Sequence, residues 1–256
     1  MAFAAGKVIQ GGRARRIIAA GAGPRARSRF SAAEQHRGRL VRISGAARGV
    51  ISQGQSAMKI LFMPGVGGDP AFWQPVAERL PAAWQKTLLG WPGLGNQSPA
   101  PDITGWNDLY RSVEQRIDGK VALIAQSMGG ALAMRAALDH PDSVSHLVLT
   151  ATSGGIDLTS FDVQDWREEY RRAYPRAPAW VYERPPAPEA HLQDLTIPTL
   201  LIWATRDPIS PLPVGRHLAR LLPNAKLIAL DDDSHLFARE RPDDIAPLIT
   251  AHLTQP

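Results

Sequence analysis

From Met58 onward, short apolar runs alternate with longer amphipathic segments, and this rhythm limits the possible folds more than any other feature of the sequence. Short apolar runs bounded by turn residues are typical of buried strands, and long amphipathic segments are typical of helices. Strands that alternate with helices form βα units around a mainly parallel sheet. We therefore predict an α/β fold in which a mainly parallel central sheet is flanked by helices.

The same rhythm predicts where the elements lie. Strands are expected at 60–63, 87–89, 121–125, 147–151, 199–204 and 226–230. Helices are expected at about 70–80, 106–117, from the turn at 126–129 to 138, 214–222 and 244–253. At 256 residues the chain is long enough for one such domain, which we place at 58–256.

The alternation is interrupted between Gly154 and Asp194, in a stretch rich in Pro, Arg, Trp and Tyr. We interpret this stretch as a short cap inserted into the α/β domain. Its aromatic residues could face a substrate, but aromatic residues at helical spacing more often pack against one another, and we favour packing. These residues are Trp166, Tyr170, Tyr174, Trp180 and Tyr182.

Residues 1–57 differ in composition from the rest of the chain. They hold Lys7 and ten arginines against a single acid, Glu34, whereas the chain from Met58 on has 18 basic and 23 acidic residues. The high isoelectric point thus comes from this basic N-terminal extension, which we predict to be poorly ordered because it has few large hydrophobic residues. A weak exception is 40–52, where one or two edge strands are conceivable.

Three interpretations of the extension stay open. Its arginine-rich, acid-poor composition fits an organellar transit peptide, and its charge fits a nucleic-acid-binding tail. We favour the third, translation from upstream of a natural start at Met58, because Met58 directly precedes the first convincing strand. Under this interpretation the protein is expected in the cytoplasm.

Several classes of site are excluded by composition and spacing. The chain has no cysteine, which rules out disulfides and thiolate chemistry. No apolar run approaches the roughly 18 residues of a membrane span, and no histidine or carboxylate pattern has metal-ligand spacing. The loop Gly65–Gly68 lacks the spacing of nucleotide-binding motifs. We therefore expect a small-molecule substrate, no metal or other cofactor, no membrane span and no nucleic acid bound to the folded domain.

The segment Ala125-Gln126-Ser127-Met128-Gly129 lies between a predicted strand and a predicted helix. It departs by one letter from the G-x-S-x-G nucleophile elbow, where a serine on a strained turn needs small residues two positions away on both sides. Ala125 and Gly129 meet that need. The alternative is an ordinary serine that caps a helix.

A serine nucleophile requires a base, and the base requires an orienting acid. Asp207 follows the predicted strand 199–204, and His235 follows the predicted strand 226–230. The carboxyl ends of parallel strands meet at one edge of the sheet, where ligands and catalysis gather. We predict a triad of Ser127, Asp207 and His235, with the acids at 231–233 as the less favoured alternative to Asp207.

The stretch from about Lys59 to Leu253 resembles the α/β-hydrolase superfamily. The likeness is carried by Pro64-Gly65 with Trp73, Gly90-Trp91-Pro92-Gly93-Leu94-Gly95, the elbow at Ser127, Ile197-Pro198 before the strand that leads to Asp207, and His235 followed by Glu240-Arg241-Pro242. This resemblance implies the same fold, and it places Asp207 and His235 at the acid and base positions.

The resemblance also implies an oxyanion hole, made by the backbone N–H groups of Val66 and Met128. The family commonly has His-Gly where this chain has Pro64-Gly65, so an imidazole that braces the loop is missing. Gly65, Trp73 and Trp91 are predicted to contact the substrate.

The expected activity is hydrolysis of a small or medium acyl ester, or of a related carboxylic bond, through an acyl-enzyme on Ser127. Two alternatives stay open at this stage. One is a non-hydrolytic enzyme on the same fold, such as a lyase or perhydrolase, and the other is a signalling protein that binds a ligand in a hydrolase pocket. The second would be expected to lack a triad member.

Overall fold

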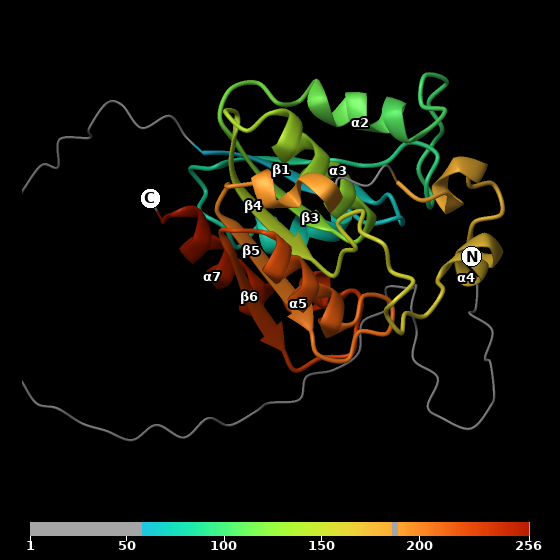
Figure 1. Ribbon diagram of the computed structural model, residues 1–256. Coiled ribbons are helices and arrows are strands. Elements are labelled where there is room, and N and C mark those ends of the chain that lie inside the picture. Colours follow the sequence, from blue (N-terminus) through green and yellow to red (C-terminus); the bar gives the residue numbers. More distant parts are fainter. Residues whose placement is uncertain (1–57, 186–188, 256) are drawn as a thin grey trace, which may run out of the picture. The chain divides into compact units, whose positions relative to one another are not determined.

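A computed structural model describes residues 58–185 and 189–255. The basic extension and the edge strands considered at 40–52 lie outside the described residues. Where the chain is described, the predicted α/β fold is confirmed: a single sheet of six parallel strands has the order β2-β1-β3-β4-β5-β6 (Figure 1). The strands are β1 (Lys59–Met63), β2 (Gln85–Leu88), β3 (Val121–Gln126), β4 (Val144–Thr150), β5 (Thr199–Ala204) and β6 (Ala225–Leu230).

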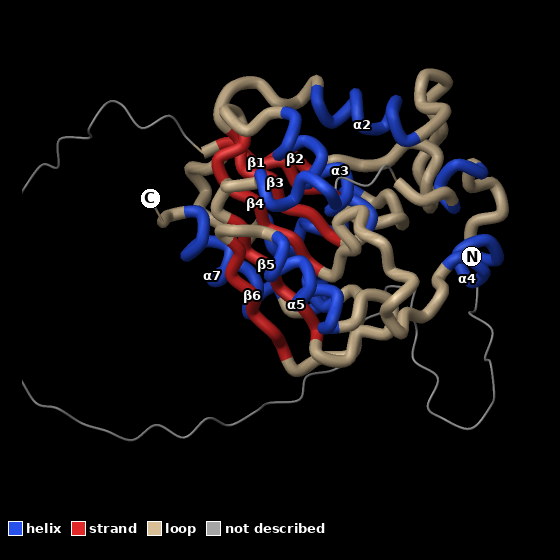
Figure 2. The backbone as a smooth tube through the Cα atoms, in the orientation of Figure 1, coloured by secondary structure: helices blue, strands red, loops and turns tan. Residues whose placement is uncertain are grey.

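Helices cover both faces of the sheet (Figure 2). One face carries α2 (Trp106–Glu114), α3 (Met128–Asp139) and α5 (Leu212–Leu221), and the other carries η1 (Pro70–Trp73), α1 (Gln74–Ala77), α6 (Phe237–Glu240) and α7 (Pro242–Leu253). Successive strand residues point to opposite faces. Leu123 of β3 therefore packs against the helices of the first face and Ile124 against those of the second, and every residue of β3 is buried because both faces are covered.

Several element boundaries differ from the prediction. The expected helix 70–80 is a 3₁₀ turn, η1, followed by the four-residue α1, which ends at Ala77. The expected strand 87–89 begins at Gln85, because β2 pairs along β1 from Lys59 onward in spite of its polar residues. An edge strand has only one neighbouring strand and exposes alternate side chains, so its apolar signal is weak.

The described part of the cap holds three short helices, α4 (Arg167–Ala173), η2 (Ala179–Tyr182) and η3 (Glu189–Asp194). Its aromatic side chains pack against one another and against the domain. Tyr170 and Tyr174 have ring centroids 4.9 Å apart, and Trp180 meets Trp106 of α2 at 5.6 Å. Tyr170 and Trp180 are buried. These contacts support the packing interpretation of the cap aromatics.

Two histidines meet at the amino-terminal side of the sheet, where α7 packs. The rings of His146 in β4 and His252 in α7 lie edge to face, 5.3 Å apart. Among the described residues, neither nitrogen of His146 nor Nε2 of His252 has a hydrogen-bond partner. Burial lowers the pKa of both imidazoles, and each histidine is therefore held in its neutral form.

We expect this histidine pair to make the protein less stable in acid. The unfolded chain takes up protons below the ordinary histidine pKa of about 6.5, whereas the folded state resists protonation until its lowered pKa values are reached. The free energy of unfolding should therefore decrease as the pH is lowered from about 6.5 toward the pKa values of the folded state. Urea unfolding at a series of pH values measures this slope. His252→Leu should make the free energy of unfolding depend less on pH, whereas replacing the exposed histidine in His191→Leu should not. An unchanged pH dependence in His252→Leu would show that the histidine pair is not its source.

The strand order changes direction at the centre of the sheet. From β1 the chain moves to β2 on one side, and it then crosses to β3 on the other side. In open α/β sheets, ligands bind outside the carboxyl ends of the strands at such a switch point. The loops that follow β1 and β3 begin with Pro64 and Ser127, so the glycine loop and the candidate nucleophile leave the sheet side by side.

Candidate active site

Ser127 stands on a sharp turn between β3 and α3. Its backbone has φ 51° and ψ −121°, a conformation that a residue with a side chain rarely adopts. Close packing enforces the turn: a Cβ at Gly129 would lie 2.5 Å from the carbonyl oxygen of Pro64. Ser127 is the N-cap residue of α3, but its hydroxyl makes no capping hydrogen bond to that helix, which favours a nucleophile over an ordinary capping serine.

The structure brings the three predicted triad residues together. His235 Nε2 lies 3.0 Å from Ser127 Oγ, and His235 Nδ1 lies 2.7 Å from Asp207 Oδ2. The imidazole is 11% exposed, whereas the Asp207 side chain is fully buried. Because an ionised carboxylate can only accept hydrogen bonds, the Nδ1 proton points at Asp207 and leaves the lone pair of Nε2 facing the serine hydroxyl.

Asp207 is fixed by its own turn. Its second carboxylate oxygen, Oδ1, accepts the backbone N–H groups of Ile209 at 2.8 Å and Ser210 at 3.1 Å. The carboxylate therefore has donors on both oxygens and only one orientation available to it. Two of the alternative acids are engaged elsewhere: Asp231 pairs with Arg206, and Asp232 pairs with Arg241 at 3.2 Å.

Thr152, which follows β4, links the nucleophile to the acid. Its buried hydroxyl donates to the carbonyl of Ser127 at 2.6 Å and accepts the N–H of Gly154 at 2.9 Å. Its own carbonyl accepts a hydrogen bond from the hydroxyl of Ser210, beside Asp207, at 3.3 Å. The strained turn at Ser127 and the turn at Asp207 thus share one buried polar residue, which holds them at a constant separation.

The glycine loop after β1 is held by aromatic side chains. The indole N–H of Trp73 donates to Met63 O, and that of Trp91 donates to Pro64 O, both at 2.9 Å. Trp73 is 0% and Trp91 is 1% exposed. The prediction that these tryptophans contact the substrate is wrong, because both rings are buried and their one polar group is used to hold the loop.

Two backbone N–H groups near Ser127 are available to a ligand. Met128 is the first residue of α3, and the N–H groups of a first helical turn have no partner within the helix. The N–H of Val66 donates to no acceptor in the described part of the chain. The positive end of the α3 dipole also lies at this point.

Gln126 connects the glycine loop to the histidine loop. Its amide nitrogen donates to the carbonyl of His235 at 3.2 Å. Its amide oxygen lies against Gly65, where an added Cβ would be 2.3 Å from that oxygen and 3.1 Å from the Cβ of Ser127. Gly65 therefore borders the nucleophile, and its contact with a substrate stays a prediction.

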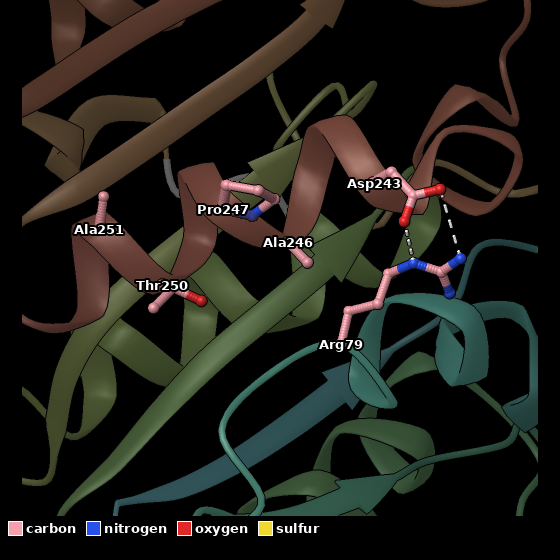
Figure 3. A pocket seen from close by; sticks show the side chains of 6 residues that line it. All are labelled: Arg79, Asp243, Ala246, Pro247, Thr250 and Ala251. Carbon is pink, nitrogen blue, oxygen red and sulfur yellow. Dashed lines mark hydrogen bonds and ion pairs between the residues drawn. The ribbon is translucent and has the colours of Figure 1, made fainter.

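A surface groove of about 440 Å³ lies between Arg79, just after α1, and α7, and its lining side chains are drawn in Figure 3. It is lined by Arg79, Asp243, Ala246, Pro247, Thr250 and Ala251. No triad residue lines this groove, which belongs to the packing of α7. Within 58–185 and 189–255, no three His, Asp or Glu side chains are grouped to hold a metal ion, and no helix there is long and apolar enough to cross a membrane.

Comparison with known families agrees with this arrangement. A family model described as the alpha/beta hydrolase fold matches residues 59–184, and a model described as TAP-like protein matches residues 170–256. The two matches overlap and together include Ser127, Asp207 and His235. The chain belongs to the α/β-hydrolase superfamily.

This α/β hydrolase has distant relatives of known activity. It is 25% identical over 214 residues to the pimeloyl-[acyl-carrier protein] methyl ester esterase of Legionella pneumophila, an alignment that covers 70% of this chain and 88% of the relative. It is 27% identical over 240 residues to the poly(3-hydroxyalkanoate) depolymerase of Ectopseudomonas oleovorans, covering 77% and 84%. The crystal structure of a hydrolase from Pseudomonas aeruginosa PA01 superposes with a TM-score of 0.64 at 18% identity and covers 78% of this chain and 91% of that one.

Three residues of this α/β hydrolase site were not assigned a role from the sequence. Gln126 occupies a variable position of the elbow, so its type carries no information there. Thr152 is a polar residue at the end of a buried strand, which is a signal that could have found it. Tyr170 has the spacing of a packing residue, and only the folded chain shows where its hydroxyl lies.

Proposed function

We propose that this protein is a serine hydrolase that cleaves small or medium acyl esters through an acyl-enzyme on Ser127. The observation that carries the proposal is the chain of two hydrogen bonds from Asp207 through His235 to the serine hydroxyl. Complete triads favour an enzyme over a binding protein on the same fold. A relative named as a methyl ester esterase supports the type of bond.

In the proposed reaction, Ser127 Oγ attacks the ester carbonyl while His235 Nε2 takes the hydroxyl proton. The carbonyl oxygen becomes an alkoxide, and the N–H groups of Val66 and Met128 stabilise it. The intermediate collapses, and the alcohol leaves with the proton from the imidazole. A water molecule then repeats the attack on the acyl-enzyme, which releases the acid and restores the serine.

The short cap favours a compact acyl group. Its helix α4 has seven residues and η2 has four; η2 packs against the domain through Trp180 and Trp106, and α4 contacts it through the Tyr170 hydroxyl. We propose that such a cap covers a short acyl chain and does not enclose a long one.

The proposal is tested by active-site labelling and an ester series. A fluorophosphonate probe should modify the protein at one residue, and mass spectrometry of the peptides should locate the adduct on Ser127. p-Nitrophenyl esters of increasing chain length should be hydrolysed, with the highest kcat/KM for short or medium acyl groups. A protein that neither takes up the probe nor turns over any ester of the series is not a serine hydrolase.

A further inference from the structure

The hydroxyl of Tyr170 lies between two loops that border the nucleophile. The residue belongs to α4 of the cap, and it is 1% exposed. Its hydroxyl donates to the carbonyl of Val66 at 2.9 Å and accepts the N–H of Gly95 at 2.9 Å. One cap side chain therefore contacts both the glycine loop after β1 and the loop after β2.

The bond to Val66 completes the set of contacts that hold the glycine loop. The carbonyls of Met63 and Pro64 accept from buried tryptophans of the domain, and the carbonyl of Gly65 accepts the N–H of Gly68 at 3.0 Å. The Val66 carbonyl is held from the cap. The Val66 N–H shares a planar peptide group with the Gly65 carbonyl, which Gly68 holds, and Tyr170 holds the next peptide group through the Val66 carbonyl. Hydrogen bonds therefore fix the peptide groups on both sides of the Val66 Cα, which limits rotation of the Val66 N–H.

The glycine loop after β1 and the loop after β2 are in close contact, which lets one buried hydroxyl bond to both. Gly95 has φ 57°, and a Cβ there would lie 2.0 Å from the carbonyl oxygen of Gly67. Only glycine allows this approach, which presents the Gly95 N–H to the phenol oxygen. That bond leaves the Tyr170 hydroxyl proton free to point at Val66, so the phenol is both oriented and satisfied.

We propose that Tyr170 is a positioning residue, whose hydroxyl orients the Val66 N–H toward the oxyanion formed in the reaction. This inference rests on the proposed function, and it adds a role for the cap in transition-state stabilisation. Burial raises the pKa of Tyr170 to about 12, so the hydroxyl remains a donor at any pH used for assay. Tyr170 touches neither the nucleophile nor the base.

The test is Tyr170→Phe, which removes the hydroxyl and keeps the ring. We expect kcat for p-nitrophenyl butyrate to fall about 10-fold, less than the ~10²–10³ that follows loss of an oxyanion donor itself. KM should change little, because the interaction matters only when the oxyanion forms. The inhibition constant of a boronic acid, which forms a tetrahedral adduct on the serine, should rise by the same factor.

The matched control is Tyr174→Phe, which removes a hydroxyl from the neighbouring ring of the same aromatic cluster. It should leave kcat, KM and boronate inhibition unchanged. All values of kcat are taken per active site titrated with the fluorophosphonate probe, so a partly unfolded preparation does not mimic the effect. Unchanged kcat in Tyr170→Phe, or equal losses in the two variants, would overturn the role of Tyr170.

If phenylalanine at position 170 prevents folding, 3,5-difluorotyrosine at the same position keeps both hydrogen bonds at neutral pH. Its phenol ionises at lower pH than tyrosine, and a phenolate cannot donate to Val66 O. The substituted enzyme should lose kcat on the alkaline side where the natural enzyme does not, and a pH profile without that loss would refute the proposal. If the natural protein neither labels at Ser127 nor hydrolyses esters, the proposed function itself fails. If the natural protein labels and hydrolyses esters but Tyr170→Phe has no effect, only the positioning role of Tyr170 fails.

Discussion

Replacing Ser127 with alanine should reduce ester hydrolysis on the order of 10⁶-fold and abolish fluorophosphonate labelling. The triad acts as a unit, so the loss of its nucleophile removes almost all of its contribution. The small residual rate comes from substrate binding and the backbone N–H groups. Stopped assays with p-nitrophenyl esters, together with gel-based detection of the probe, measure both effects.

The control is Ser112→Ala on α2, where the serine hydroxyl donates to Leu109 O and lies away from the triad. This variant should label and turn over ester like the natural protein. If Ser127→Ala keeps more than about one per cent of the natural kcat, the attacking group is another residue.

Asp207→Asn should lower kcat by about 10⁴-fold while the protein stays folded. An amide can present its NH₂ group to the imidazole, which then carries its proton on Nε2 and cannot accept one from Ser127. KM should change much less than kcat, because Asp207 is buried behind His235. Steady-state kinetics and thermal unfolding of the variant separate loss of chemistry from loss of fold.

Asp231→Asn is the matched control, because this residue is one of the alternative acids considered for the triad. Its carboxylate is exposed and pairs with Arg206, and exposed ion pairs contribute at most about 1 kcal/mol to stability. The activity of this variant should stay within about 2-fold of the natural value. A large loss in Asp231→Asn with a small loss in Asp207→Asn would reverse the assignment.

The sequence predicted strands best where an apolar run marks them. Strand β5 spans Thr199–Ala204 as predicted, because every residue in it is buried and the run is apolar from Leu200 to Ala204. Strand β2 lies at the edge of the sheet, and its start at Gln85 depends on pairing with β1, which no local pattern of polar residues reveals. Local hydrophobicity thus located the apolar part of each strand, including β6 at the other edge, and missed the polar starts of β2 and β4.

Some residues of the site could also be predicted from local sequence, and others could not. Ser127, Asp207 and His235 were predictable because each follows a strand and all strands end at one edge. Trp73 and Trp91 were misjudged because a tryptophan can be buried when a backbone carbonyl accepts its N–H, and the sequence does not show which carbonyl will be near. Tyr170 was assigned to packing for the same reason: its ring does pack, and the acceptor of its hydroxyl lies in a distant loop.

The position of the Tyr170 hydroxyl on the cap affects how this enzyme could acquire new substrates. An inserted segment that only shaped the acyl site could be exchanged between relatives, since the scaffold beneath it would keep its reactivity. Here a cap taken from another enzyme would also have to place a tyrosine hydroxyl within hydrogen-bond distance of the Val66 carbonyl. Divergence of specificity in this lineage is therefore expected to proceed by point changes around a retained α4, and wholesale replacement of the segment is expected to be rare.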